Sequence, residues 1–190
     1  MPHAIESAPT GRAKCRACGR AIAKDSLRFG ERAPNPFGEG EASFWFHLRC
    51  AACKRPEPVH EVLACADAAL AADEAALLQG LCARGLAHPR LARVHRVEHA
   101  SSARARCRHC HETIDRGLLR IGLDWWEEGR FSGAGFIHLS CAREYFGTAQ
   151  DLPLRLRTSM GEGLTAELDA ELISALASAP STDGGDASPG

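Results

Sequence analysis

The chain has 190 residues, of which 45% are hydrophobic and 25% charged, and its formal net charge is −1. This length suits one medium domain or two small ones, and no apolar run is long enough to span a bilayer. A near-neutral charge excludes a protein that coats DNA by charge alone, so any nucleic-acid site must be a local basic patch. Because the nine cysteines occur without a signal-peptide pattern, we expect an intracellular protein whose thiols bind metal.

The first expected unit, residues 1–58, is organised around two ligand pairs. A Cys-x-x-Cys turn is separated by 28 residues from a His-x-x-Cys pair, and alternation predicts strands over residues 26–32 and 43–48. Three thiolates and one imidazole form the tetrahedral ligand set of structural zinc, which leaves no position open for water. The expected ligands are Cys15, Cys18, His47 and Cys50.

Residues 59–93 are expected to form a helical linker or extension. Its leucines recur at helical spacing, and Gly85 is expected to end the helix. Its two cysteines, Cys65 and Cys82, lack a ligand pattern, so we expect them to pack as small apolar groups. The leucines in question are Leu63, Leu70, Leu77, Leu78 and Leu81.

The second expected unit, residues 94–150, repeats the first at an offset of 92 residues. Arg12 recurs as Arg104 and Arg28 as Arg120, and both ligand pairs recur in register after a one-residue deletion. Buried free cysteines have no reason to repeat in pairs, so the repetition predicts a second zinc site. The expected strands cover residues 118–124 and 135–139, and the expected ligands are Cys107, Cys110, His138 and Cys141.

Residues 151–178 are expected to form a helical extension in which leucines recur every four residues and Thr165 caps the helix. Residues 179–190 consist largely of Ser, Pro, Gly and Asp, so we expect a disordered tail. The predicted fold class is α+β, with two small zinc-bound repeats, each a short antiparallel sheet followed by helical segments. Each unit is too small to be held together by burial alone, so metal binding and folding should be linked.

The residues around the ligands carry a further pattern. The first copy contains Thr10-Gly-Arg-Ala-Lys-Cys-Arg-Ala-Cys18, then Ile22, Leu27-Arg28, Trp45-Phe46-His47 and Cys50, and the second contains Ser102-Ala-Arg-Ala-Arg-Cys-Arg-His-Cys110, then Ile114, Leu119-Arg120-Ile121-Gly122, His138 and Cys141. This pattern resembles the poly(ADP-ribose) polymerase-type zinc finger in two tandem copies, over residues 4–55 and 96–147. The resemblance implies a sheet with a helix after the last ligand and binding to DNA nicks, gaps and ends. The family's catalytic domain does not fit in the rest of this chain.

The resemblance implies phosphate contacts by basic residues before the first cysteine pair and on the Leu-Arg strand. Guanidinium groups suit phosphate oxygens, and residues 1–60 hold ten Lys/Arg against six Asp/Glu. The alternative is that these are ordinary solvated arginines. The implied contacts are Arg12, Arg28, Arg104 and Arg120, in a patch that Lys14, Arg16, Arg106 and Arg108 would widen.

The resemblance also implies an apolar loop that stacks on bases exposed at a break. The expected stacking positions hold small residues in both copies, which departs from the family pattern. A neighbouring aromatic ring can take this role, at ~1–3 kcal/mol per stacked base. The alternative is that the rings fill the small finger core. The candidate rings are Phe37, Trp126 and Phe131.

These features predict a protein that is not an enzyme and that recognises DNA structure rather than sequence, as an adaptor in DNA damage or repair. Two structural Zn²⁺ ions are the expected cofactors, and DNA with breaks or exposed ends is the expected partner. We expect no membrane contact, favour a monomer, and note that the apolar helices offer a site for a protein partner. The location would be the cytoplasm or nucleoid of a bacterium or the nucleus of a eukaryote. The alternatives are a zinc-stabilised protein-interaction module and a binder of single-stranded DNA or RNA.

Overall fold

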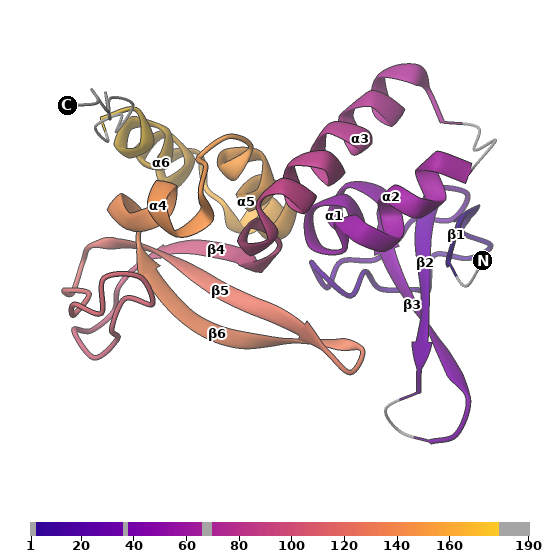
Figure 1. The fold of residues 1–190 in the computed structure, drawn as a ribbon, viewed down its shortest axis with the longest axis horizontal. Coiled ribbons are helices and arrows are strands. Elements are labelled where there is room, and N and C mark those ends of the chain that lie inside the picture. The colour runs from indigo at the N-terminus through magenta and orange to yellow at the C-terminus, as the bar shows by residue number, and fades with distance from the viewer. Residues whose placement is uncertain (1–2, 36–37, 66–69, 179–190) are drawn as a thin grey trace, which may run out of the picture.

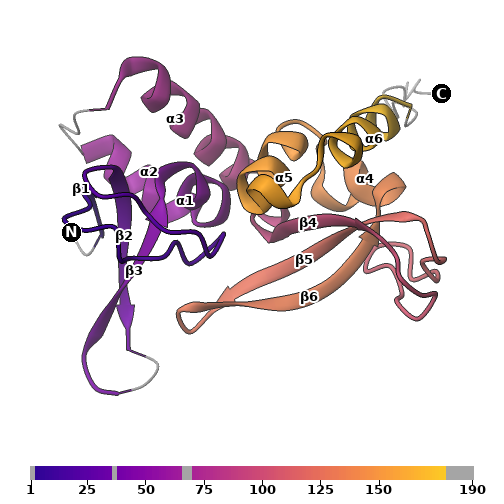
Figure 2. The ribbon, with the colours of Figure 1, turned by 180° about the vertical axis from the view of Figure 1, so that it is seen from behind.

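The computed structural model describes residues 3–35, 38–65 and 70–178, which form two lobes side by side (Figure 1). Each lobe contains a three-stranded sheet with helices packed against it, and the view from behind shows the same division (Figure 2). The first lobe consists of β1 (His3–Ser7), β2 (Leu27–Pro34), β3 (Glu41–His47), α1 (Leu48–Lys54), α2 (Pro56–Cys65) and α3 (Ala72–Ala87). The short 3-10 helix η1 (Pro89–Arg93) connects it to the second lobe, which consists of β4 (Val94–His99), β5 (Leu119–Glu127), β6 (Arg130–His138), η2 (Leu139–Cys141), α4 (Ala142–Phe146), α5 (Leu152–Met160), η3 (Gly161–Gly163) and α6 (Ala166–Ser178).

The two sheets have the same topology and the same register around the ligand histidines, although among the described residues only the second sheet has irregularities, at Val94–Arg96 and Leu123–Asp124. Both are antiparallel, in the orders β1-β2-β3 and β4-β5-β6. Arg28 lies between Glu6 and the ligand His47, and Arg120 lies between Glu98 and the ligand His138. The predicted fold class of two small α+β units is therefore confirmed, and the sequence repeat is a structural repeat.

Some fully buried side chains of the two lobes occupy equivalent positions. Three pairs lie at the spacing of the sequence repeat, and all six side chains are completely shielded from solvent. Burial of such side chains is worth about 1.5–3 kcal/mol each, so each lobe has its own small core beside its cysteine cluster. The pairs are Ile22 and Ile114, Phe29 and Ile121, and Phe46 and Ile137.

The helices differ from the prediction at Gly85 and agree with it at Thr165. Gly85 does not end a helix, because α3 continues to Ala87. A Cβ on Gly85 would lie 2.9 Å from Cβ of Pro56, so glycine is explained there by the close approach of α2. The predicted cap of the last helix is confirmed, since the Leu168 N–H donates to Thr165 Oγ1 at 3.3 Å.

Several elements carried too weak a local pattern to be predicted. β1 and β4 are short edge strands, and α5 was not separated from the rest of the C-terminal helical segment. The expected disordered tail, residues 179–190, lies outside the described residues. No helix in the part of the chain that the structure describes has the length and apolar character needed to cross a membrane.

Candidate zinc centres and nucleic-acid interface

The first candidate metal centre brings together the four predicted ligands of the first lobe. The loop before β2 supplies Cys15 and Cys18, the end of β3 supplies His47, and α1 supplies Cys50. Their ligand atoms all lie within 4.8 Å of one another. His47 Nδ1 is 3.4 Å from Cys18 Sγ and 3.9 Å from Cys50 Sγ, and ligands spaced in this way suit a tetrahedral zinc ion with bonds of ~2.0–2.3 Å.

The second centre has the same geometry. Its four predicted ligands also gather within 4.8 Å, and His138 Nδ1 lies 3.4 Å from Cys110 Sγ and 3.9 Å from Cys141 Sγ. The backbone N–H of His138 donates to Cys107 Sγ at 3.4 Å, as that of His47 does to Cys15 Sγ. Such N–H···S contacts stabilise thiolate charge.

Each ligand histidine is held in the orientation that a metal requires. The Nε2 atom of His47 lies 3.1 Å from the carbonyl oxygen of Ala21, and that of His138 lies 3.2 Å from the carbonyl oxygen of Thr113. A ring whose Nε2–H donates to a carbonyl presents an unprotonated Nδ1, here directed at the sulfurs. This donor set therefore fits zinc.

The clustered thiols influence one another's ionisation. Hydrogen bonding to Cys15 lowers the pKa of Cys18 and raises that of Cys50. In the second lobe, burial opposes ionisation of Cys107, but N–H groups such as that of Cys110 outweigh it and bring its pKa to about 6. Burial and the nearby Cys107 charge raise the pKa of Cys141 to about 12. Three thiolates can share so small a volume only with a cation among them.

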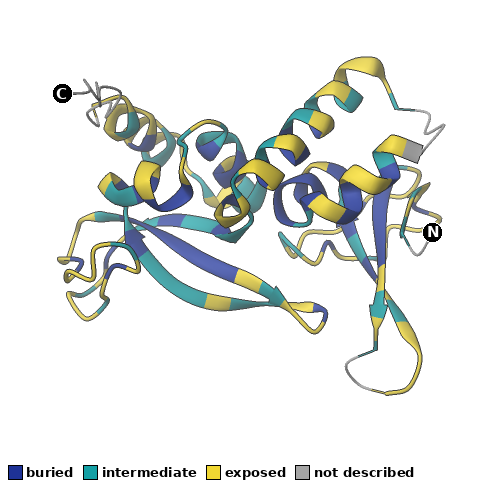
Figure 3. Ribbon diagram, viewed as in Figure 1, coloured by how far each residue is buried: buried dark blue, intermediate teal, exposed yellow. Residues whose placement is uncertain are grey.

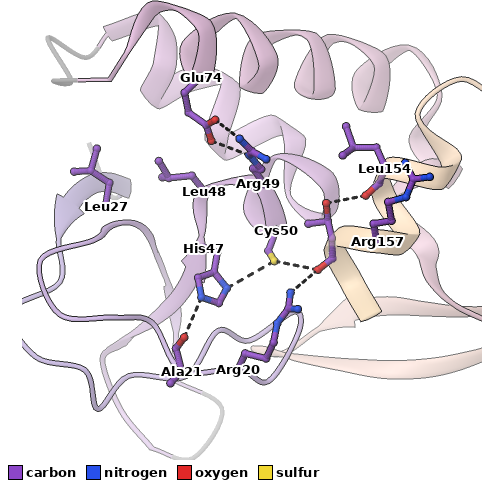
Figure 4. A pocket seen from close by; sticks show the side chains of 11 residues that line it. Arg20, Ala21, Leu27, His47, Leu48, Arg49, Cys50, Glu74, Leu154 and Arg157 are labelled. Atoms are coloured by element: carbon purple, nitrogen blue, oxygen red, sulfur yellow. Dashed lines mark hydrogen bonds and ion pairs between the residues drawn. The ribbon is translucent and has the colours of Figure 1, made fainter. Parts of the chain in front are cut away.

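The first centre borders an open cavity with a volume of about 640 Å³ (Figure 4). His47 and Cys50 form part of its wall, and an Arg49–Glu74 ion pair of 2.7 Å forms its rim. Helix α5 of the second lobe closes one side, where Arg20 donates to the carbonyl oxygen of Thr158 at 2.8 Å. Arg20 also donates to Cys18 Sγ at 3.3 Å, so one arginine connects the first metal centre to the second lobe.

Two of the four arginines implied as phosphate contacts are buried. Arg28 donates to Glu6 at 2.6 Å and Arg120 to Glu98 at 2.5 Å, and only 7% and 9% of their side chains are exposed. Their guanidinium carbons also lie 3.5 Å and 3.7 Å from the ring centroids of Trp45 and Phe136. A guanidinium with a carboxylate and a ring as neighbours is already satisfied within the protein. These two side chains are therefore buried in ion pairs, and are not solvated as the expected phosphate contacts would be.

The other two, Arg12 and Arg104, are exposed in the loops that precede the cysteine pairs. Six further basic residues in these loops are exposed as well. Within the described part of the chain, none of these eight cations forms an ion pair. Each lobe therefore presents uncompensated positive charge beside its metal centre. These exposed residues are Arg12, Lys14, Arg16 and Lys24 in the first lobe and Arg104, Arg106, Arg108 and Arg116 in the second.

Two of the three candidate stacking rings lie between the lobes. Trp126 contacts Phe44 and Phe46 of the first lobe, with ring centroids 5.4 Å and 5.6 Å away. Phe131 lies 4.8 Å from Trp126 and 6.5 Å from Phe46. Both rings pack against the first core, which matches the alternative that aromatics fill a core, although the core is that of the other lobe. Phe37 lies outside the described residues.

Polar groups that the sequence did not single out complete the contact between the lobes. Lys54 at the end of α1 donates to Asp124 of β5 at 2.5 Å, and both side chains are at least 96% buried. His95 Nδ1 lies 3.1 Å from the second Asp124 oxygen, a suitable distance but without hydrogen-bond geometry. Burial lowers the pKa of Lys54, although the Asp124 charge opposes this shift. A pair separated by 70 residues leaves no spacing signal in the sequence.

Arg155 of α5 has a similar bridging position. Its side chain is buried and donates to the carbonyl oxygens of Cys53 and Leu81 in the first lobe, at 2.8 Å and 2.9 Å. Desolvation lowers its pKa, partly offset by nearby Cys53 and Asp151. Cys82 is buried outside both metal clusters, as expected, and burial raises its pKa to about 12. Cys53 is also buried outside both clusters.

Comparison with known proteins identifies the first finger. Residues 6–79 match the family described as the poly(ADP-ribose) polymerase and DNA-ligase Zn-finger region. The chain is 27% identical to a poly(ADP-ribose) polymerase of Drosophila melanogaster over 80% of this chain and 18% of the relative. It is 42% identical to poly(ADP-ribose) polymerase 1 of Caenorhabditis elegans and 43% identical to that of Gallus gallus, each over 26% of this chain and 5% of the relative.

The chain thus spans less than a fifth of the length of these relatives, and the family match covers a zinc-finger region. Residues 6–79 are a zinc finger of the poly(ADP-ribose) polymerase type. Together with the two clusters of three cysteines and one histidine, this establishes two structural zinc sites.

Proposed function

We propose that this chain is a zinc-dependent DNA-binding protein that recognises nicks, gaps and ends by their structure, and that its second lobe is another finger of the same family. The second lobe repeats the strand pairing beside the ligand histidine, the ligand geometry and the exposed cations of the first. A role as an adaptor in DNA repair, without catalytic activity of its own, follows as part of the same proposal.

One observation carries this proposal: Arg12 and Arg104 are exposed at equivalent places beside the two metal centres. A guanidinium binds a phosphate through free donors, and in Arg28 and Arg120 the Nε and Nη2 donors are already occupied by Glu6 and Glu98. We therefore assign phosphate contact mainly to Arg12 and Arg104. Arg28 and Arg120 are assigned a supporting role, in which they hold the outer strand and the ring beside it.

For stacking on an exposed base we retain Phe37 from the sequence prediction. Trp126 and Phe131 are engaged by the first lobe, so their stacking on DNA would require the lobes to separate. In this proposal the loop of the first finger stacks on a base exposed at the break, and Arg104 of the second finger contacts the phosphate backbone.

The test is a binding panel of intact, nicked, gapped and blunt duplexes and single strands at several salt concentrations. Removing one phosphate contact reduces the slope of log affinity against log salt by about 0.9. Replacing both Arg12 and Arg104 by Ala should therefore reduce the slope by about 1.8. Arg49→Ala with Arg143→Ala is the matched control, because these exposed arginines lie on helices α1 and α4.

The proposal fails if the Arg12/Arg104 variant keeps the wild-type affinity and salt slope, a result that would favour a protein-interaction module. Tighter binding to single strands than to any interrupted duplex would favour the single-strand alternative. Phe37→Ala should remove the preference for gapped over intact duplex while leaving the salt slope unchanged, because stacking releases no counterions.

A further inference from the structure

A second arginine-rich site lies in the second lobe and includes Arg108, which stands between the ligands Cys107 and Cys110 of the second metal centre. Three arginines and two aromatic rings line a cavity with a volume of about 440 Å³. Gly133 of β6 also lines it, and the absence of a side chain there leaves room for a ligand. The five side chains are Arg90 and Arg93 of η1, Arg108, Trp125 of β5, and Tyr145 of α4.

The arginines of this cavity are oriented but not neutralised. Arg90 donates to the backbone oxygen of Tyr145 at 3.2 Å, and Arg93 donates to the Tyr145 hydroxyl at 3.3 Å. Arg108 lies across Gly135, where an added Cβ would be 2.7 Å from its Nε. Among the described residues no carboxylate pairs with any of the three, and none lines the cavity. Three like charges around one cavity attract an anion.

Trp125 adds a flat apolar surface to this charge. It is 48% exposed, whereas its neighbour Trp126 packs against the first lobe. Successive side chains of a strand face opposite sides, so β5 directs one indole into the seam between the lobes and the other toward the arginines. An exposed indole beside guanidinium groups is the combination that binds a base together with its phosphate.

We propose that this cavity binds an unpaired nucleotide of a DNA strand, with its phosphate on Arg90, Arg93 and Arg108 and its base on Trp125. The inference rests on the proposed DNA binding and names a contact that combines the connecting helix η1 with the second lobe. A phosphate on a peptide would use the arginines equally well but would not require the indole. The exposed Trp125 therefore favours a nucleotide.

The probe is a blunt duplex compared with the same duplex carrying a short single-stranded thymidine tail, each measured by fluorescence anisotropy with the full chain. Wild type should bind the tailed duplex about tenfold or more tightly than the blunt one, within the range of one or more stacked bases. Trp125→Ala and Arg90→Ala should each remove most of that gain while leaving blunt-duplex binding within about twofold of wild type. Trp125→Phe should retain much of the gain, because phenylalanine also stacks.

Leu118→Ala is the matched control, since Leu118 is 49% exposed and does not line this cavity. The site is refuted if the tail adds no affinity, or if Trp125→Ala keeps the full gain. Blunt-duplex binding that still depends on Arg12 and Arg104 would then leave the proposed function standing. Absence of binding to every DNA would overturn both. Competition by a phosphopeptide that persists in Trp125→Ala would assign the cavity to a protein ligand and overturn the nucleotide.

Discussion

The β2–β3 and β5–β6 hairpins are equivalent in the sequence repeat but have different surroundings. The first projects away from the body, and Gly38, Glu39 and Gly40 in its turn are exposed (Figure 3). The second points at the first lobe, where Gly129 in its turn is buried under the ring of Phe44. Identical metal centres therefore do not imply identical roles for the loops. The described turn residues of the first hairpin are exposed to solvent, and the second hairpin packs against the first lobe.

In the proposed DNA complex, this contact would set the geometry with which the two lobes meet DNA. Trp126 and Phe131 are inserted beside Phe46, Lys54–Asp124 is buried in the same seam, and Arg155 donates across it. Contacts of this kind hold the fingers at one spacing and orientation. Joined binding sites gain affinity only when that geometry matches the target.

The largest effect should follow from loss of a metal ligand. Cys15→Ala should reduce the bound zinc from two equivalents to one and unfold the first finger, because structural zinc contributes roughly 10 kcal/mol or more to folding. The second finger should retain its zinc but expose Trp126, whose packing partners lie in the first lobe. Metal analysis and tryptophan fluorescence measure both consequences.

Cys82→Ala serves as the control, because Cys82 is buried outside both clusters and both ions should remain. Cys107→Ala is the converse test. If each ligand variant unfolded its own lobe without altering the fluorescence of the other, the lobes would fold independently. The contact between them would then stabilise neither lobe.

The next largest effect should come from the ion pair between the lobes. Lys54→Met leaves the Asp124 carboxylate buried without its cation, which costs about 3–5 kcal/mol. Chemical denaturation at neutral pH measures the loss. Adding Asp124→Leu should recover most of it, since an apolar pair can replace a buried ion pair. If Lys54→Met alone were as stable as wild type, the contact between the lobes would have to be open in solution.

The two turn glycines give a matched test of the different surroundings of the hairpins. Gly40 and Gly129 both have positive φ, +86° and +76°, so Ala at either position costs about 1–2 kcal/mol in backbone strain. Only Gly129 faces Phe44, and overpacking adds about 1–3 kcal/mol there. The thermal unfolding midpoint of Gly129→Ala should therefore be clearly lower than that of Gly40→Ala. Equal effects would mean that the second hairpin does not dock on the first lobe.

The smallest effect concerns the long helices of the two lobes. Thr165 caps α6, whereas Ala71 at the start of α3 has no side-chain cap. Thr165→Ala should destabilise by about 1 kcal/mol and Ala71→Ser should stabilise by about 0.5–1 kcal/mol. Denaturation curves of the two variants test whether the lobes unfold together, since a cooperative unit registers both changes in a single transition.

The amino-acid sequence alone determined the metal centres, because ligand type and spacing are local chemistry, and the repeat made the pattern unambiguous. It also predicted most strand positions and the Thr165 cap. The partners of Arg28, Arg120, Trp126 and Phe131 were decided only by tertiary structure. Whether a cation or ring faces solvent, a carboxylate or the other lobe depends on contacts between distant segments. Lys54 and Asp124 are separated by 70 residues, and no local pattern encodes their meeting.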